Sequence, residues 1–327
     1  MNSMSTTVGA RIAAIGTYVP ERVVTNADMA RLVDTTDDWI VRRTGIHERH
    51  AAAPDEFTSH LCEAAARDLM SRYAIDPADI DFVIACTSTP DYGFPSVACI
   101  VQDRLGLPNA GAMDLNATCA GFVYGLHTAN AFVRAGLHRN VLVVAGETLT
   151  KVTDYTDRTT CVLFGDGAGA ALVTADDGPG RFRASLVGSN GAGGANLYRT
   201  GLSRCIGDGA GPGLIHQNGR EVYRWAVETV STGVAQLLAD AGLTTTDLDW
   251  FVPHSANNRI IEAVCERLGI PSDRTLSSIA MNGNTSAATI PLALRAGERA
   301  DRLKPGQLVL LYGFGGGLVH AGTIVEW

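Results

Sequence analysis

The chain has 327 residues, of which 46% are hydrophobic and 18% charged, and its formal net charge is −8. This composition is typical of a globular, well-packed protein with one large domain or two smaller ones. The negative charge argues against nonspecific nucleic-acid binding, and no apolar run reaches the ~18 residues that would predict a membrane span.

The cysteines and the N-terminal segment bear on the compartment. The seven cysteines are odd in number and include no Cys-x-x-Cys pair, so neither a disulfide framework nor a zinc site is predicted. The segment MNSMSTTVGARIAAIG has no basic stretch followed by an apolar one, so no secretory signal is predicted. We therefore expect a cytoplasmic protein in a reducing environment, with no bound metal.

The first half of the chain alternates between predicted strands and helices. In chain order we expect a strand at Arg11–Tyr18, a short helix at Asn26–Asp34 with Asn26 as its N-cap, a helix at Thr58–Tyr73, a strand at Asp81–Thr87, a helix at Val97–Leu105, a strand at Asn140–Gly146, a polar loop at Lys151–Thr160 and strand character at Cys161–Val173. Continuous apolar runs such as NVLVVAG are typical of parallel sheets.

The stretch Ala112–Gly136 is the centre of this half. It begins as a short apolar strand, turns at Asn116–Thr118 and continues as a helix with apolar residues at 3.6-residue spacing. Cys119 lies at the predicted helix start, where the positive end of the helix dipole favours the nucleophilic thiolate. A buried, unreactive cysteine is the alternative, and for a cysteine taken alone it is the commoner case.

The second half repeats this plan. In chain order we expect a helix at Val222–Leu243, a strand at Asp249–Pro253, a helix at Asn258–Leu268, a strand at Thr275–Ala280, a turn at Asn282–Asn284, helix over most of Ser286–Leu303, and strands at Val309–Tyr312 and Ala321–Val325 on either side of GFGGG.

Three short segments match between the halves in the same order. DIDFV at 79–83 matches DLDWF at 247–251, RLGLP at 104–108 matches RLGIP at 267–271, and FGDG at 164–167 matches FGGG at 314–317. We therefore predict an α/β protein of two similar halves, 1–180 and 181–327, related by a pseudo-twofold axis and joined near Asp176–Gly194. Under this symmetry Cys119 and Asn284 fall at equivalent strand-to-helix turns.

A cysteine, a histidine and an asparagine are predicted to meet at one end of the sheets. Cys119 and Asn284 belong to the two equivalent turns, and His254 follows the strand Asp249–Pro253. A Cys-His-Asn set on separate loops suits acyl transfer through a thioester. Each residue alone is weak evidence, because a lone histidine is usually a surface or satisfied core residue and such an asparagine is usually a turn or cap.

Seven segments spread over nearly the whole chain carry a more specific pattern. They are DDWIVRRTGIHERH, FPSVACIVQDRLG, DLNATCAGFVYGL, DRTTCVLFGDGAGAALV, WFVPHSANNRIIEAV, GNTSAATIPLAL and QLVLLYGFGGGL. In this order they resemble the β-ketoacyl-acyl carrier protein synthase III family of the thiolase superfamily. The resemblance implies a thiolase-like five-layered αβαβα fold, a homodimer and a decarboxylating Claisen condensation. Acyl-CoA and malonyl-acyl carrier protein are the implied substrates, with no permanently bound cofactor.

The resemblance also implies roles for the central residues. Cys119 takes the acyl group, and its own N–H and that of Gly316 form an oxyanion hole, each donor being worth about 3 kcal/mol. His254 Nε2 and Asn284 Nδ2 hold the malonyl thioester carbonyl, on which negative charge builds as CO2 leaves. Two uncharged donors stabilise this enolate without protonating the carbon that must attack.

The resemblance also implies a coenzyme A binding site at the mouth of the pocket. The matching residues are Trp39 and Arg158 for the adenine clamp, Arg43 and Arg259 for the phosphates and pantetheine, and Asn257 for the tunnel. An arginine–tryptophan clamp is physically reasonable through stacking and cation–π attraction. Without the resemblance, a solvated basic face would be the better interpretation of the arginines. A basic rim would also attract an acidic carrier protein.

Phe94 and Phe314 are assigned to the acyl pocket, Phe94 by crossing a dimer interface into the partner's pocket. The chain departs from the family pattern at Ser255, Arg220 and Val319–His320, and in the glycine-rich stretch Tyr198–His216. These departures leave the primer open: branched, medium-chain and secondary-metabolite primers are all compatible. Two other functions stay open, an acyltransferase or thioester hydrolase that does not decarboxylate, and a noncatalytic docking module.

Overall fold

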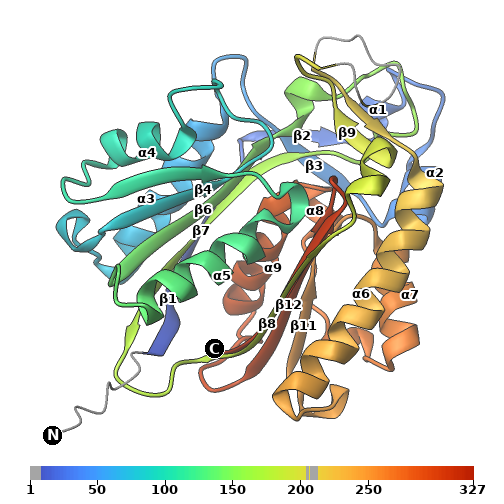
Figure 1. The fold of residues 1–327 in the computed structure, drawn as a ribbon. Coiled ribbons are helices and arrows are strands. Elements are labelled where there is room, and N and C mark those ends of the chain that lie inside the picture. Colours follow the sequence, from blue (N-terminus) through green and yellow to red (C-terminus); the bar gives the residue numbers. More distant parts are fainter. Residues whose placement is uncertain (1–8, 204–205, 207–212) are drawn as a thin grey trace, which may run out of the picture.

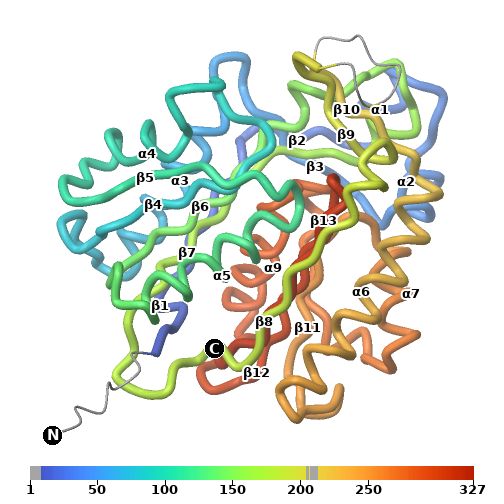
Figure 2. Tube along the Cα trace, viewed as in Figure 1, coloured from blue at the N-terminus to red at the C-terminus, as the bar shows by residue number. Residues whose placement is uncertain are grey.

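The computed structural model describes residues 9–203, 206 and 213–327, so the first eight residues, Cys205 and the middle of the stretch Tyr198–His216 lie outside the described residues. Its elements form five layers in the order helices, sheet, helices, sheet, helices (Figure 1). Figure 2 follows the chain from the first sheet, in blue and green, to the second, in yellow-green, orange and red. This arrangement confirms the predicted five-layered α/β architecture.

The first sheet has five strands in the spatial order β1-β7-β6-β4-β5. Their bounds are β1 (Gly9–Tyr18), β4 (Phe82–Cys86), β5 (Gly111–Leu115), β6 (Asn140–Thr148) and β7 (Asp166–Asp176). β4 is parallel to both β5 and β6, whereas β7 is antiparallel to β6 and β1. Since parallel strands end at the same edge of a sheet, β5 delivers the turn that carries Cys119 to the edge where β4 and β6 also end.

The second sheet has the order β11-β12-β13-β8. Its strands are β8 (Phe182–Ser189), β11 (Trp250–Pro253), β12 (Leu308–Gly315) and β13 (Val319–Glu326). β11 is parallel to β12, and the β12–β13 and β13–β8 pairs are antiparallel. These directions reproduce those of β4, β6, β7 and β1, as the repeat predicts. His254 and Gly316, which follow β11 and β12, therefore share one edge.

The predicted strand Thr275–Ala280 is wrong. It occupies the place of β5 in the repeat, but only Thr275 forms a bridge, to Phe251. The backbone N–H of Ser278 binds the Ser255 hydroxyl and helix α8 begins at Ile279, so side-chain hydrogen bonds replace the ladder.

Helices cover both sheets on both faces. α3 (Thr58–Tyr73) and α4 (Val97–Leu105) pack on the outer face of the first sheet, α6 (Gly219–Ala241) and α7 (Asn258–Leu268) on the outer face of the second, and α5 (Gly121–Arg134) and α9 (Thr289–Arg299) between the two. The bounds of α3, α4 and α7 are those predicted from apolar spacing. The division into domains at residue 180 stays a prediction, because the core around α5 and α9 joins the two sheets.

The segment predicted to join the halves is shorter than expected. The connection spans only residues 177–181, and the following Phe182–Ser189 is strand β8. Its alternation of half-buried and exposed residues matches the period of a strand with one covered face, a signal that the sequence carries.

The remaining short elements surround the site. They are α1 (Asn26–Met29), α2 (Asp37–Thr44), α8 (Ile279–Asn282), and two pairs of antiparallel strands, β2 (Arg22–Thr25) with β3 (Glu48–Ala51) and β9 (Leu197–Arg199) with β10 (Ile215–Gln217). The predicted N-cap Asn26 is wrong, since Thr25 caps α1 in a capping box with Asp28. Asn26 is instead buried and donates to Asp37 and to the carbonyl of Ile46. Among the described residues, no helix is long and apolar enough to cross a bilayer.

Candidate active site

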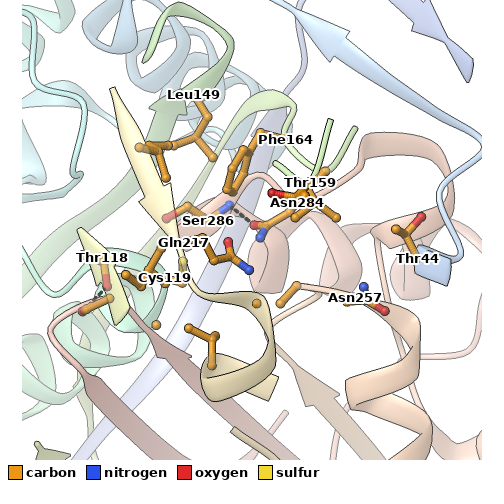
Figure 3. A pocket seen from close by; sticks show the side chains of 18 of the residues that line it. Thr44, Thr118, Cys119, Leu149, Thr159, Phe164, Gln217, Asn257, Asn284 and Ser286 are labelled. Atoms are coloured by element: carbon orange, nitrogen blue, oxygen red, sulfur yellow. Dashed lines mark hydrogen bonds between the residues drawn. The ribbon is translucent and has the colours of Figure 1, made fainter. Parts of the chain in front are cut away.

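A cavity of about 650 Å³ opens at the shared edge of the two sheets. It is lined by ten of the eleven residues predicted for the site, namely Trp39, Arg43, Cys119, Arg158, His254, Asn257, Arg259, Asn284, Phe314 and Gly316. Figure 3 shows Cys119 on one side of this pocket, Asn257 and Thr44 on the other, and Asn284 with Ser286 between them. The eleventh residue, Phe94, does not line the cavity of its own chain, and it is 90% exposed.

Cys119 sits on a sharp turn between β5 and α5. The turn is a single turn of 3-10 helix, η2 (Thr118–Ala120), and Thr118 adopts a left-handed φ of 44°. The Thr118 hydroxyl donates to the carbonyl of Gly316 over 2.8 Å. The N–H groups of Cys119 and Gly316 and the hydroxyl of Ser286 lie within hydrogen-bonding reach of the sulfur. The predicted oxyanion donors therefore converge on the predicted nucleophile.

The expectation that the helix start favours the thiolate is wrong. Burial raises the pKa of the Cys119 thiol to about 12, outweighing the donors from Ser286, Cys119 and Gly316, and the nearby Glu147 raises it further. The helix α5 begins only at Gly121, after the η2 turn, so Cys119 does not occupy its first turn. The raised pKa favours the thiol form of Cys119 in the resting protein, so its use as a nucleophile would need a group that accepts the thiol proton.

Close packing against the Cys119 turn explains two of the glycines in the GFGGG motif at 313–317. A Cβ on Gly315 would lie 2.8 Å from the Cβ and 2.9 Å from the Sγ of Cys119, closer than side chains tolerate. A Cβ on Gly313 would lie 2.7 Å from the Cα of Ala120. These two glycines let the end of β12 pass directly beside the turn that carries the nucleophile.

The amide of Asn284 is oriented by the backbone. Its Oδ1 accepts the N–H of Ser286 over 2.9 Å, drawn as a dashed line in Figure 3, which leaves Nδ2 free as a donor. The backbone of Asn284 is in turn bonded to Leu163 and Gly165, at 2.9 Å and 3.1 Å. Asn284 therefore presents the predicted donor on a fixed frame.

The two turns match in detail, but not with Cys119 opposite Asn284. Thr118 and Ser286 are the left-handed residues of the two turns, with φ of 44° and 51°, and each N–H binds the side chain of an asparagine two residues earlier. Asn284 thus corresponds to Asn116, and the residue that corresponds to Cys119 is Ala287. The repeat places the turns together, while each contributes a different residue to the site.

His254 follows β11 and is fully enclosed. Its backbone N–H donates to the carbonyl of Tyr312 over 2.8 Å. Its ring packs edge-on against that of Phe314, with the ring centroids 5.1 Å apart. Burial lowers the pKa of His254 to about 3, so the imidazole is neutral at physiological pH. A neutral ring donates a hydrogen bond only from the nitrogen that carries its proton.

The side chain of Thr289 determines which ring nitrogen of His254 carries the hydrogen. Its Oγ1 lies 2.7 Å from His254 Nδ1 and 2.9 Å from the carbonyl oxygen of Ser286. When the hydroxyl donates to Ser286, Nδ1 must carry the imidazole hydrogen. When it donates to Nδ1, the hydrogen is on Nε2, which the predicted Nε2 donor requires.

Three residues at the site were not predicted from the sequence: Ser286, Thr289 and Glu147. The first two belong to the NTSAAT segment at 284–289, where only Asn284 was given a role. Glu147 follows the apolar run of β6, and a charged residue at the end of a buried strand is the signal that would have found it.

The mouth of the cavity is basic and carries one tryptophan. The guanidinium groups of Arg158 and Arg43 lie 5.1 Å and 5.8 Å from the centre of the Trp39 ring. Arg158 Nη1 also donates to the carbonyl of Asp34 over 2.8 Å. Asn257 caps α7 by accepting the N–H of Arg259, which places both at the same rim.

Comparison with known families assigns this geometry. The model of 3-oxoacyl-[acyl-carrier-protein] synthase III matches residues 113–191, and the model of its C-terminal part matches residues 238–327. The chain belongs to the 3-oxoacyl-[acyl-carrier-protein] synthase III family. This membership confirms the predicted family, the thiolase-like fold and the predicted class of enzyme, an acyltransferase of the ketosynthase III type.

Individual relatives agree over the full length. The chain is 54% identical to β-ketoacyl-[acyl-carrier-protein] synthase III 2 of Halalkalibacterium halodurans, over 97% of this chain and 96% of the relative. It is 53% identical to the protein of the same name of Bacillus subtilis, over 97% and 98%. The crystal structure of synthase III from Thermus thermophilus superimposes with a TM-score of 0.92 at 46% identity, covering 97% of this chain and 98% of that one.

The structure places Ser255, His320 and Arg220, three of the departures from the family pattern. Ser255 is buried, and its hydroxyl lies 3.1 Å from that of Ser277. His320 pairs with the Tyr312 hydroxyl through Nδ1 at 2.8 Å, away from the cavity. Arg220 lies at the cavity rim. The two ends of the glycine-rich stretch belong to the antiparallel pair β9–β10, which contributes Leu197, Tyr198, Arg199, Ile215 and Gln217 to the cavity wall.

Proposed function

We propose that the chain catalyses the decarboxylative Claisen condensation of an acyl-CoA primer with malonyl-[acyl carrier protein], initiating fatty acid or related polyketide synthesis. The observation that carries this proposal is that Cys119, His254 and Asn284 line one cavity with a basic, tryptophan-bearing mouth. The names of the relatives, which specify an acyl carrier protein, support the same reaction.

In the first half-reaction Cys119 attacks the thioester carbonyl of the primer. The N–H groups of Cys119 and Gly316 hold the oxyanion of the tetrahedral intermediate, and coenzyme A leaves. Trp39, Arg43 and Arg158 bind the nucleotide end of coenzyme A, with Asn257 and Arg259 beside the pantetheine. Coenzyme A enters as part of the substrate, and no bound cofactor is needed.

In the second half-reaction the malonyl thioester carbonyl lies between His254 and Asn284. The free Nδ2 of Asn284 and a hydrogen on His254 Nε2 stabilise the enolate formed as CO2 leaves. The enolate carbon then attacks the acyl-Cys119 thioester. Since His254 is neutral, it stabilises this anion without quenching it by proton transfer.

Two features beyond the single chain belong to the proposal. We expect a homodimer in the cytoplasm, in which Phe94 reaches the acyl pocket of the partner. The 90% exposure of this aromatic side chain in the isolated chain supports such a contact. Sedimentation of Phe94→Ala and its activity with short and branched primers test the placement.

An acyl transfer without decarboxylation is the alternative. Release of labelled CO2 from malonyl-[acyl carrier protein] that depends on acyl-CoA supports condensation, and acylation without CO2 supports the alternative. Cys119→Ser should abolish primer transfer, whereas His254→Ala and Asn284→Ala should still be acylated but fail to condense. Mass spectrometry of Cys119 after exposure to a mixed acyl-CoA pool identifies the primer.

A further inference from the structure

Glu147 is a buried acid beside the active site to which the reaction scheme gives no role. It lies near the end of β6 and its side chain is 0% exposed. Its carboxylate accepts the N–H and the hydroxyl of Ser88 at 3.0 Å and 2.9 Å, and the hydroxyls of Thr87 and Thr89 at 3.2 Å and 2.6 Å. A fifth donor, the Ser286 hydroxyl, reaches Oε1 over 3.1 Å.

The surrounding hydrogen bonds favour the carboxylate form of Glu147, although burial raises its pKa. The Thr87 hydroxyl already accepts the N–H of Thr89, and the Thr89 hydroxyl accepts the N–H of Thr148, each over 3.0 Å. Their protons are therefore free to point at Glu147, as are those of Ser88. An acid ringed by donors is held in the form that only accepts.

Ser286 connects this carboxylate to the nucleophile. Its hydroxyl donates to Glu147 and also lies within hydrogen-bonding reach of the Cys119 sulfur. The left-handed backbone of Ser286 and the Asn284 side chain on its N–H hold it in this position. A hydroxyl can accept one proton while it gives up another, so the three groups form a continuous path.

We propose that Ser286 carries the thiol proton of Cys119 to Glu147 when the primer is loaded, and returns it when Cys119 is released by condensation. This proposal rests on the proposed role of Cys119 as the acylated residue. Ser286 is then a catalytic residue, because it touches the reacting sulfur, and Glu147 is a positioning and proton-storing residue that acts through it.

The two half-reactions balance. In the first, the Cys119 S–H bond breaks, the proton passes to Ser286, and the proton of Ser286 passes to Glu147. The sulfur forms a bond to the acyl carbon, and coenzyme A leaves as a thiolate that takes a proton from water. In the second, the enolate carbon displaces the Cys119 thiolate, which recovers the stored proton through Ser286. Glu147 is a carboxylate again.

Electrostatics favours this path over direct ionisation. A thiolate beside the Glu147 carboxylate would place two negative charges in one enclosed site, which raises the pKa of the thiol. Moving the proton to Glu147 leaves only one negative charge on the pair formed by Cys119 and Glu147. Burial also raises the pKa of Glu147, which makes it a better acceptor, whereas burial lowers that of His254 to about 3. Within the described part of the chain, the charge of Glu147 also raises the pKa of the buried thiols of Cys62 and Cys86.

The test compares two reactions of Cys119 in Glu147→Gln. The first is release of coenzyme A in a single turnover with acyl-CoA, and the second is alkylation by iodoacetamide, both followed between pH 6 and 10. We expect acyl transfer to slow by about 100-fold at pH 7, as for loss of a general base. Alkylation should not slow, and its pH profile should shift to lower pH, because a negative charge beside the thiol has been removed.

Asp166→Asn is the matched control. Asp166 is another fully buried acid, held by the N–H groups of Ala52 and Thr150, and it is not among the residues that line the cavity. Its variant should keep acyl transfer within about twofold of wild type per folded molecule. A purely structural need for a buried acid would slow both variants alike.

Ser286→Ala keeps Glu147 but removes the hydroxyl that links it to Cys119. It therefore tests the proposed proton transfer even if Glu147→Gln fails to fold. Acyl transfer should again fall by about 100-fold. Wild-type acyl transfer rates in either variant, or equal losses of acyl transfer and alkylation, would overturn the path while Cys119 is still acylated in the wild type. Absence of an acyl group on wild-type Cys119 by mass spectrometry would overturn the proposed function as well.

Discussion

Thr289 Oγ1 lies 2.7 Å from His254 Nδ1, and both side chains are enclosed by protein. The hydroxyl has a second partner in the carbonyl of Ser286, so the direction of one O–H bond determines the tautomer of the imidazole. A donor on Nε2 for the malonyl carbonyl exists only when Thr289 donates to the ring.

Thr289→Val therefore separates the two half-reactions. It keeps the volume of the side chain but removes the hydroxyl, so His254 loses control of its tautomer. We expect CO2 release from malonyl-[acyl carrier protein] to fall by about 100-fold, as for loss of an oxyanion donor, while acylation of Cys119 continues. Thr289→Ser, which keeps the hydroxyl, should recover most of the rate. Equal loss of acylation and CO2 release in Thr289→Val would contradict this role.

The pH dependence of alkylation tests the state of Cys119. With the pKa of the thiol raised to about 12 by burial, the thiolate fraction grows about tenfold per pH unit below that value. The rate of inactivation by iodoacetamide should therefore rise steadily from pH 7 to 10. A plateau beginning below pH 8 would instead show a thiolate stabilised at the helix start.

Gly315→Ala should disable primer loading. The new Cβ would lie 2.8 Å from the Cβ of Cys119, so the nucleophile or the end of β12 must move. A displacement of this kind near reacting atoms costs about 100-fold in rate. Gly191→Ala, where no atom lies within 4 Å of the added Cβ, is the control and should load normally. Single-turnover release of coenzyme A measures both.

Trp39→Ala should weaken binding of the nucleotide end of coenzyme A. Loss of the stacking surface beside Arg158 and Arg43 should raise KM for acyl-CoA by about tenfold, which corresponds to about 1.4 kcal/mol. Acyl-pantetheine, which lacks the adenine, should react equally with both proteins. A KM change of the same size for acyl-pantetheine would show that Trp39 acts elsewhere in the pocket.

His254 should make the fold acid-sensitive. Its pKa is lowered to about 3 in the folded chain, against about 6.5 in the unfolded chain. Between these two values the imidazole is protonated in the unfolded state and neutral in the folded state. The free energy of unfolding should fall by up to about 1.4 kcal/mol per pH unit from this residue between pH 6.5 and pH 3. Urea unfolding at pH 7.5, 5.5 and 4.5 should show a smaller decline in His254→Asn. An identical decline in both would refute this assignment.

The sequence was most informative where local spacing and the fold agree. Helices α3, α4 and α7 have the predicted bounds because their apolar stripes, and in α4 and α7 the glycines that follow them, are local signals. The internal repeat and the family motifs predicted the cavity residues, since strand ends at one edge of a sheet must converge.

The remaining features depend on contacts that no short segment specifies. The pKa of Cys119 depends on burial and on groups distant in sequence, such as Ser286 and Gly316, and not on its helix alone. Glu147 becomes part of the site only through Ser286, and Thr289 only through His254. Thr275 was assigned to a strand because its segment resembles one, yet the two serines that follow form other hydrogen bonds.

The bond from Thr118 to Gly316 joins positions 198 residues apart. Contacts of such long range form late in folding, because a large loop must close before they gain anything. The Gly316 N–H, one of the two proposed oxyanion donors, therefore follows one of the last strands to be synthesised. A nascent or C-terminally truncated chain that ends before β12 would carry Cys119 without the Gly316 donor, so we expect it to be unable to form the proposed acyl-enzyme.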